Sequence, residues 1–180
     1  MAKLPDVLRS GDLTLRRWDP AFVDELLTAI EDSYPELRQW MPWAQSVPSA
    51  DDLLAVLAEG HSAFDADRMW DYVLFDGSDT VVGAAGLRTG ESGYPEIGYW
   101  VRSRYTGRGY ATAASRALMD AVFEFLDGTE QVGVRMDIAN VASAAIPPKL
   151  GFRLVGEEDR EIVAQGHTGR GYVWVIDRPS

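Results

Sequence analysis

The sequence contains no cysteine. This absence excludes disulfide bonds, a thiolate nucleophile and zinc sites with cysteine ligands. Histidine is also scarce, with only two in the chain. Neither His61 nor His167 has a partner at the spacing of a metal site or a catalytic triad, so we expect both to be bystanders and no metal to be bound.

Positive charge is in short supply. Lys and Arg number 17 against 28 Asp and Glu, which gives a formal net charge of −11. Such a chain is poorly suited to nucleic acids or anionic membranes, and we expect neither as a partner. A cationic substrate fits the charge better, although an acidic composition commonly serves solubility alone.

Long apolar runs are missing as well. No stretch approaches the roughly 18 apolar residues that would cross a bilayer, and the first 13 residues lack the apolar region of a signal peptide. We therefore expect a cytoplasmic protein. With 180 residues and no visible linker or repeat, the chain is expected to form a single domain over residues 1–180.

The hydrophobic periodicity predicts an α/β fold. Helical spacing indicates helices over residues 21–33, 49–64 and 111–126, and a short helix from Asn140 to Leu150. Pro147 and Pro148 should bend or shorten that last helix, because they lack amide donors. Alternating residues indicate strands over 13–18, 70–75, 81–87, 94–101, 131–138, 152–163 and 172–176. This order predicts a mixed sheet in which strands 94–101 and 131–138 are parallel neighbours.

A glycine-rich turn lies between strand 94–101 and helix 111–126. Its pattern is Arg104-x-x-Gly107-x-Gly109-x-Ala111. Glycines let backbone amides approach a pyrophosphate closely, and a helix N-terminus adds partial positive charge, so the turn is typical of a phosphate cradle as well as of an ordinary loop. It lacks the Gly-Lys-Ser/Thr of a nucleotide triphosphatase, and Thr112 stands where a dinucleotide fold has its third glycine. Arg102, Arg104 and Arg108 form a cationic cluster suited to phosphate.

Two motifs in this order resemble a known family. Arg104 to Ala111 is similar to the acyl-CoA signature of the GNAT superfamily of N-acetyltransferases, and Asn140-Val-Ala-Ser143 followed by Lys149-Leu-Gly-Phe152 resembles its next motif. The resemblance covers nearly the whole chain. Segments 37–43, 96–100 and 140–143 are most similar to the branch that acetylates the N-terminal amines of ribosomal proteins.

The resemblance implies a mostly antiparallel sheet with a splayed parallel pair of strands at the acyl-CoA site. Acetyl-CoA would be the co-substrate, with its pantetheine arm along residues 99–102 and its pyrophosphate on residues 104–111. A primary amine would attack the thioester directly in a ternary complex, without a metal, and a homodimer is compatible with the family. The implied contacts to acetyl-CoA are Tyr99, Trp100, Val101, Arg102, Arg104, Gly107, Arg108, Gly109, Tyr110, Ala111 and Asn140.

Direct attack requires a base, because an alkyl amine is mostly protonated at neutral pH. Alternation places Glu96 on the same strand face as Gly98 and Trp100, which makes it our candidate base, although it could equally be a surface acid or an ion-pair partner. The tyrosine that many superfamily members use as the acid is replaced here by Pro147. The ribosomal-protein branch implies Ser143 in its place, while Asn140 and Ser143 could also simply stabilise the start of their helix.

Trp40 and Trp43 flank a Met-Pro pair in a segment without a regular apolar stripe. They are candidates for the walls of an acceptor slot, and large aromatic residues are also common in cores. The favoured acceptor is the α-amine of a protein or peptide. One alternative acceptor is a small amine such as a polyamine or antibiotic, and an alternative function is that of a non-catalytic acyl-CoA sensor. A long open groove would favour the peptide, and a short closed groove would favour the small molecule.

Overall fold

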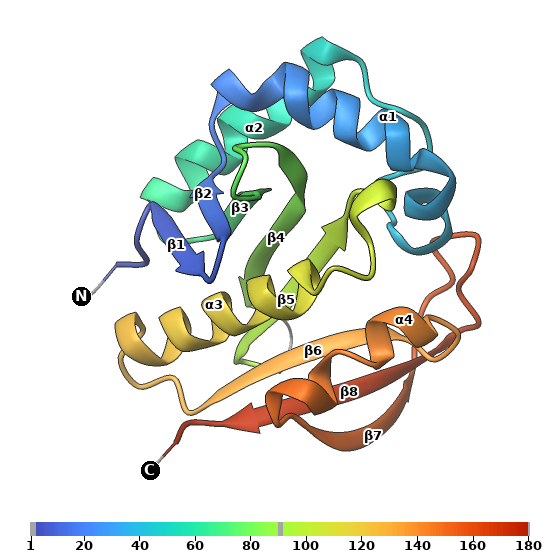
Figure 1. Cartoon of the computed structure of the whole chain (residues 1–180). Helices are drawn as coiled ribbons and strands as arrows, with labels where there is room; N and C mark the ends of the chain where they lie inside the picture. The colour runs from blue at the N-terminus through green and yellow to red at the C-terminus, as the bar shows by residue number, and fades with distance from the viewer. Residues whose placement is uncertain (1–2, 90–91, 180) are drawn as a thin grey trace.

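The computed structural model describes residues 3–89 and 92–179. Within them, eight strands form one sheet in the order β1-β2-β3-β4-β5-β6-β8-β7, in which every neighbouring pair is antiparallel except β5 and β6 (Figure 1). The strands are β1 (Val7–Ser10), β2 (Leu13–Arg17), β3 (Trp70–Phe75), β4 (Val81–Thr89), β5 (Pro95–Val101), β6 (Gln131–Asp137), β7 (Arg153–Asp159) and β8 (Arg170–Asp177). The mixed, mostly antiparallel sheet and its one parallel pair are confirmed.

Helices cover both faces of the sheet. Helices α1 (Val23–Trp40) and α2 (Ala50–Asp65) pack against the side chains of Val73 and Phe75 in one hydrophobic cluster. Helix α3 (Tyr110–Phe125) packs on the opposite face, where Leu74 and Leu87 belong to a second cluster. Strand β3 is buried along its whole length because both of its faces are covered.

Helix α1 is longer than its pattern predicts. A 3-10 turn, η1 (Pro20–Phe22), precedes it, and the helix continues through Pro35 to Trp40, so the expected end at residue 33 is wrong. Proline removes one helical hydrogen bond. The buried stripe nevertheless continues through Ser33 and Leu37, and tertiary packing of that stripe outweighs the local penalty.

Strand β1 was not predicted. It forms a hairpin with β2, with Ser10 opposite Leu13, so the loop is the dipeptide Gly11-Asp12. Gly11 has a φ of +58°, in the left-handed region that such tight turns require. The dipeptide Gly11-Asp12 between two short runs with buried leucines could have indicated the hairpin. It was overlooked because β1 has only four residues.

The proline pair divides the last predicted helix, as expected. Helix α4 (Val141–Ala144) ends before Pro147, and a 3-10 turn, η3 (Pro147–Leu150), follows and is capped by Gly151. Strand β7 stops at Asp159 rather than at residue 163. No helix among the described residues is long and apolar enough to cross a lipid bilayer.

Candidate active site

Strands β5 and β6 separate soon after they pair. Their parallel register consists of Glu96 opposite Gly133 and Ile97 opposite Val134, whereas β4 stays paired with β5 as far as Val101. Figure 1 shows β6, β8 and β7 running below α3 and β1 to β4 above it, while β5 starts near β6 and passes behind α3. Beyond Ile97, β5 therefore has an edge that faces an opening in the sheet.

The glycine turn leads from this opening into α3. Both Gly107 and Gly109 have positive φ values, +76° and +84°, which other residues adopt only with strain. Gly109 is the N-cap of α3 and supplies no side-chain hydrogen bond to the helix. Its carbonyl accepts the amide of Ala113, so the amides of the first turn have no partner within the helix. An uncapped helix N-terminus beside two left-handed glycines has the geometry of an anion site.

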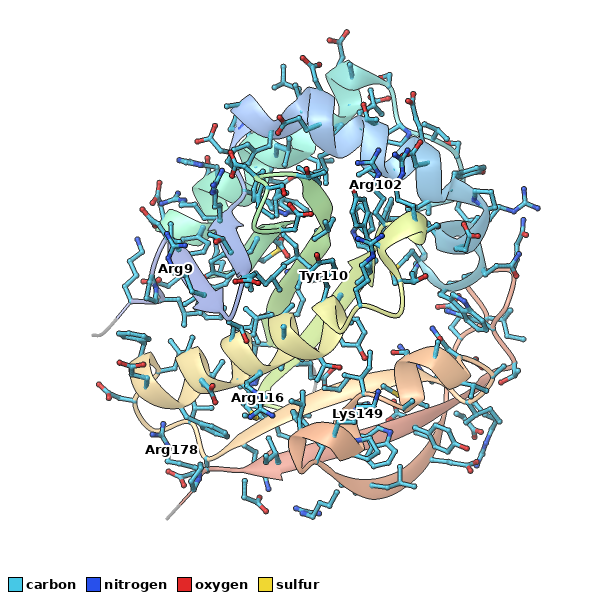
Figure 2. All side chains as sticks on the ribbon, in the orientation of Figure 1. Arg9, Arg102, Tyr110, Arg116, Lys149 and Arg178 are labelled. Atoms are coloured by element: carbon cyan, nitrogen blue, oxygen red, sulfur yellow. The ribbon has the colours of Figure 1, made fainter. Side chains whose placement is uncertain are left out.

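The three arginines near this turn have different surroundings. Arg102 is buried, and its Nε donates to Asp32 Oδ2 over 2.8 Å, while Arg104 also pairs with Asp32. The hydrogen bond from Arg102 is the main cause that lowers the pKa of Asp32. Figure 2 shows Arg102 beside α1 and Tyr110 at the start of α3.

Arg108 differs from its two neighbours. Its guanidinium lies 4.9 Å from the centroid of the Tyr105 ring, and the described residues provide it with no ion pair. The expected cluster is thus divided: the Asp32 carboxylate engages Arg102 and Arg104, which leaves Arg108 as the arginine best placed for an anion. Its contact with phosphate stays a prediction.

The segment after β6 reaches back across the opening. Asn140 Oδ1 accepts the amide of Ser143 over 3.2 Å and so caps α4. The Ser143 hydroxyl lies 2.9 Å from the Tyr99 hydroxyl, which joins α4 to β5 on the far side of the gap. Burial raises the pKa of Tyr99 to about 12, so its hydroxyl is neutral at physiological pH.

Glu96 lies in a network of charges near the start of the splay. Its Oε1 accepts a hydrogen bond from Arg135 Nε over 2.8 Å and another from Ser92 over 2.9 Å. Arg135 also contacts both carboxylate oxygens of Glu158, at 2.6 and 2.5 Å. An ion pair was one of the roles expected for Glu96, but its partners Arg135 and Glu158 could not be predicted, because no local pattern links these positions.

A cavity of about 510 Å³ lies on the sheet face covered by α1 and α2. Gly98, Tyr99 and Trp100 of β5 contribute to its lining, so it adjoins the strand that borders the opening. Trp43 also lines it, with its ring centroid 6.2 Å from that of Trp100. Trp40 is not among the lining residues, because its ring packs against the backbone at Gly166. Of the two candidate tryptophans, only Trp43 therefore lines this cavity, and the role of either one at an acceptor stays a prediction.

The cavity also contains an ion pair that was not predicted from the sequence. Asp71 is buried and accepts two hydrogen bonds from the Arg88 guanidinium, at 2.7 and 2.8 Å. Burial is the main influence on the Asp71 carboxyl and raises its pKa, although the hydrogen bonds from Arg88 act in the opposite direction. Asp71 and Arg88 lie on different strands, and no local sequence pattern indicates that they pair.

The two histidines contact backbone carbonyls. His61 Nδ1 lies 2.9 Å from the carbonyl oxygen of Trp18, and His167 Nε2 lies 3.2 Å from that of Trp40. The described part of the chain contains no group of three or more acidic or histidine side chains that could hold a metal ion.

Comparison with known proteins identifies the family. Residues 12–153 match the family model described as an acetyltransferase (GNAT) domain. The chain belongs to the GNAT acetyltransferase family. It is therefore an acyltransferase, and GNAT enzymes use acetyl-CoA as co-substrate.

Individual GNAT proteins resemble the chain over most of its length. A Bacillus subtilis protein named "Putative ribosomal N-acetyltransferase YdaF" is 28% identical over 144 residues, which cover 78% of this chain and 77% of that protein. The structure of RimL, a ribosomal L7/L12 α-N-protein acetyltransferase in complex with coenzyme A, aligns with a TM-score of 0.84 at 20% identity over 97% of both chains. Mycobacterium smegmatis RimJ with CoA-disulfide aligns with a TM-score of 0.83 at 22% identity, over 95% of this chain and 85% of that one.

The residues of this GNAT chain fit its co-substrate. The uncapped start of α3 and the left-handed glycines suit a pyrophosphate, and the unpaired edge of β5 offers backbone groups to an extended arm. When bound, acetyl-CoA supplies the activated acetyl thioester. Gly107, Gly109 and Tyr110 at the turn, and Tyr99 to Val101 along β5, are the residues that would hold it.

Proposed function

We propose that this GNAT enzyme acetylates the N-terminal α-amine of a protein or peptide, by direct attack of the amine in a ternary complex. One observation carries the proposal: β5 borders the opening in the sheet with one edge and lines the acceptor cavity with Gly98 and Trp100. An amine in the cavity and a thioester in the opening would therefore meet at the same strand. The name of the RimL structure, an α-N-protein acetyltransferase, supports an α-amine as the acceptor.

Glu96 is proposed as the base. It lies on β5 two residues before Gly98, and its carboxylate is fixed by Arg135 and Ser92. A fixed carboxylate accepts the ammonium proton, directly or through a water molecule, so that the neutral amine can attack. Backbone amides along the unpaired edge of β5 would stabilise the negative charge that develops on the carbonyl oxygen.

Ser143 is proposed as the acid that protonates the departing thiolate. The Tyr99 hydroxyl lies 2.9 Å from Ser143 Oγ and donates to the Ser143 carbonyl oxygen over 3.3 Å, so Tyr99 holds Ser143 at the edge of the opening. Asn140 fixes the backbone of Ser143 by capping α4. These contacts support the proposal that the Ser143 hydroxyl takes the part of the tyrosine acid that this chain lacks.

The test is CoA release with acetyl-CoA and a panel of short peptides, polyamines and aminoglycosides. We expect turnover on peptides, and a fall in kcat of roughly 10² to 10⁴ in Glu96→Gln and Ser143→Ala, the range typical of a lost acid or base. Glu158→Gln is the matched control, because it removes the other carboxylate of Arg135. An equal loss of kcat in Glu158→Gln would mean that Glu96 acts only as part of the ion network and not as the base.

A small primary amine is the second candidate acceptor. The observation that favours it is the size of the cavity, about 510 Å³, which suits one residue or a small molecule rather than a long peptide. Turnover of polyamines or aminoglycosides without any turnover of peptides would establish this alternative. Binding of acetyl-CoA with no acetylation of the whole panel would instead indicate a sensor.

A further inference from the structure

The floor of the acceptor cavity is formed by β4 and β5, which have glycines at two positions that face one another across the strands. Gly86 of β4 and Gly98 of β5 are direct cross-strand partners, and both line the cavity. A Cβ atom on Gly98 would meet no atom within 4 Å, which shows that this position faces open space. A Cβ on Gly86 would clash with Asp71 Oδ1, so the Asp71–Arg88 pair extends across that glycine.

The walls are mainly apolar and come from both covering helices as well as the sheet. Helix α1 contributes Leu26 and Ile30, and α2 contributes Leu53 and Val56. Trp43 and Trp100 add two aromatic rings on one side. Cavities of this kind bind ligands mostly by burying apolar surface, with a few polar groups fixing the orientation.

The charges at the cavity favour a cation. Its lining contains three carboxylates, Asp52, Glu59 and Asp71, and one guanidinium, that of Arg88. Because Asp71 and Arg88 neutralise one another, Asp52 and Glu59 leave an excess of negative charge. The tryptophan rings also attract an ammonium group through their faces. The cavity therefore combines a large apolar volume with attraction for a positively charged amine.

We infer that the preferred acceptor carries a large apolar or aromatic side chain next to its reactive amine. This inference rests on the proposed function and names its substrate class as a peptide whose first residue is bulky and apolar. A first residue as small as Ser or Ala would leave most of the 510 Å³ and its aromatic walls without a contact. An aromatic side chain would instead bury the walls, and the excess negative charge of the lining would attract the ammonium group into the cavity.

The experiment compares peptides of identical sequence that begin with Ser, Ala, Leu, Phe or Trp, together with ethylamine and phenethylamine. In apolar pockets a single methylene changes kcat/KM by about 10-fold or more. We therefore expect kcat/KM for the Phe peptide to exceed that for the Ala peptide at least tenfold. A Ser or Ala peptide that reacts as well as the Phe peptide would overturn the inference and leave the proposed function intact.

The variants locate the preference in the cavity. Val56→Trp narrows the cavity from α2, and we expect it to lower the ratio of Phe to Ala turnover at least tenfold. The control is Leu54→Trp, two residues earlier on the same helix, because Leu54 is exposed to a similar degree as Val56 but lies outside the lining. Because the readout is a ratio, a general loss of activity does not imitate the effect. An unchanged ratio in Val56→Trp would place the preference elsewhere and refute the assignment.

The amines separate the inference from the proposed function. Acetylation of phenethylamine at least tenfold better than ethylamine, with no peptide turnover, would preserve the apolar preference and end the N-terminal proposal. If none of the peptides and amines is acetylated while acetyl-CoA binds, both fail.

Discussion

Tyr99 and Ser143 are separated by 44 positions in the chain, yet their hydroxyl groups are 2.9 Å apart. The sequence suggested Ser143 as an acid only through a family resemblance, and it assigned Tyr99 to the co-substrate alone. The structure adds a contact between the two side chains across the opening. Tyr99 is therefore a positioning residue in the proposed mechanism, because it acts through the hydroxyl of Ser143.

The role of Tyr99 is testable with Tyr99→Phe. We expect kcat to fall about tenfold, less than in Ser143→Ala, because the serine hydroxyl remains but loses its orientation. Since the pKa of Tyr99 is raised to about 12, the pH–rate profile of the wild type should show no tyrosine titration below about pH 10. The double variant should be no slower than Ser143→Ala. Additive losses would instead mean that Tyr99 acts independently of the serine.

Asp32 and Arg102 determine how α1 is attached to the end of β5. The pKa of the Asp32 carboxyl is lowered below 3.8, mainly by the hydrogen bond from Arg102. A carboxyl with a lowered folded-state pKa stabilises the protein above its unfolded-state pKa, and this stabilisation disappears as the pH falls through the folded-state value. The contact joins α1, which carries Asp32, to the residue that directly follows β5, and so it does not depend on the glycine turn.

Replacing Asp32 by Asn should therefore destabilise the protein in a pH-dependent way. We expect a lower free energy of unfolding at pH 7, because the buried Arg102 loses its charged partner. The difference from the wild type should shrink as the pH falls below 3.8. Urea denaturation at a series of pH values measures it. A difference that is constant from pH 7 to pH 3 would contradict the ion-pair interpretation.

The start of α3 depends on Gly109, whose φ is +84°. Gly109→Ala should lower the free energy of unfolding by about 1–2 kcal/mol, the cost of a left-handed conformation with a Cβ. It should also raise the KM for acetyl-CoA, because strain relief would shift the amides of the turn. Gly156→Ala is the control, since its added Cβ meets no atom within 4 Å and its φ is not in the left-handed region. An unchanged KM in Gly109→Ala would separate this turn from co-substrate binding.

At the scale of the whole molecule, the net charge of −11 should influence which peptides approach. A peptide with two lysines after its first residues should react faster than its glutamate counterpart at low salt, by about tenfold, through electrostatic steering. The difference should vanish near 1 M salt, where the Debye length is about 3 Å. Initial rates of CoA release across a salt series provide the measurement. If the advantage of the lysine peptide persists at high salt, a specific contact rather than the overall field is responsible.

Most elements of the fold were predictable because their signals are local. Alternation along β3 to β6, helical spacing along α2 and α3, and the two proline residues in the last helix each reflect neighbours within a few positions. The errors arose where packing overrode local preference, as when α1 continued through Pro35, or where an element was very short, as with β1.

The amino-acid sequence by itself determined the order of the elements from β2 onward, the glycine turn before α3 and the family resemblance, because all three depend on residue type and spacing along the chain. Only the tertiary structure decided which partners the charged and polar groups have. Glu96 pairs with Arg135, and Arg102 pairs with Asp32. Tyr99 contacts Ser143, and Trp43 lines the cavity whereas Trp40 does not. These contacts join distant segments, and they form only when burial of the two hydrophobic clusters brings the helices onto the sheet.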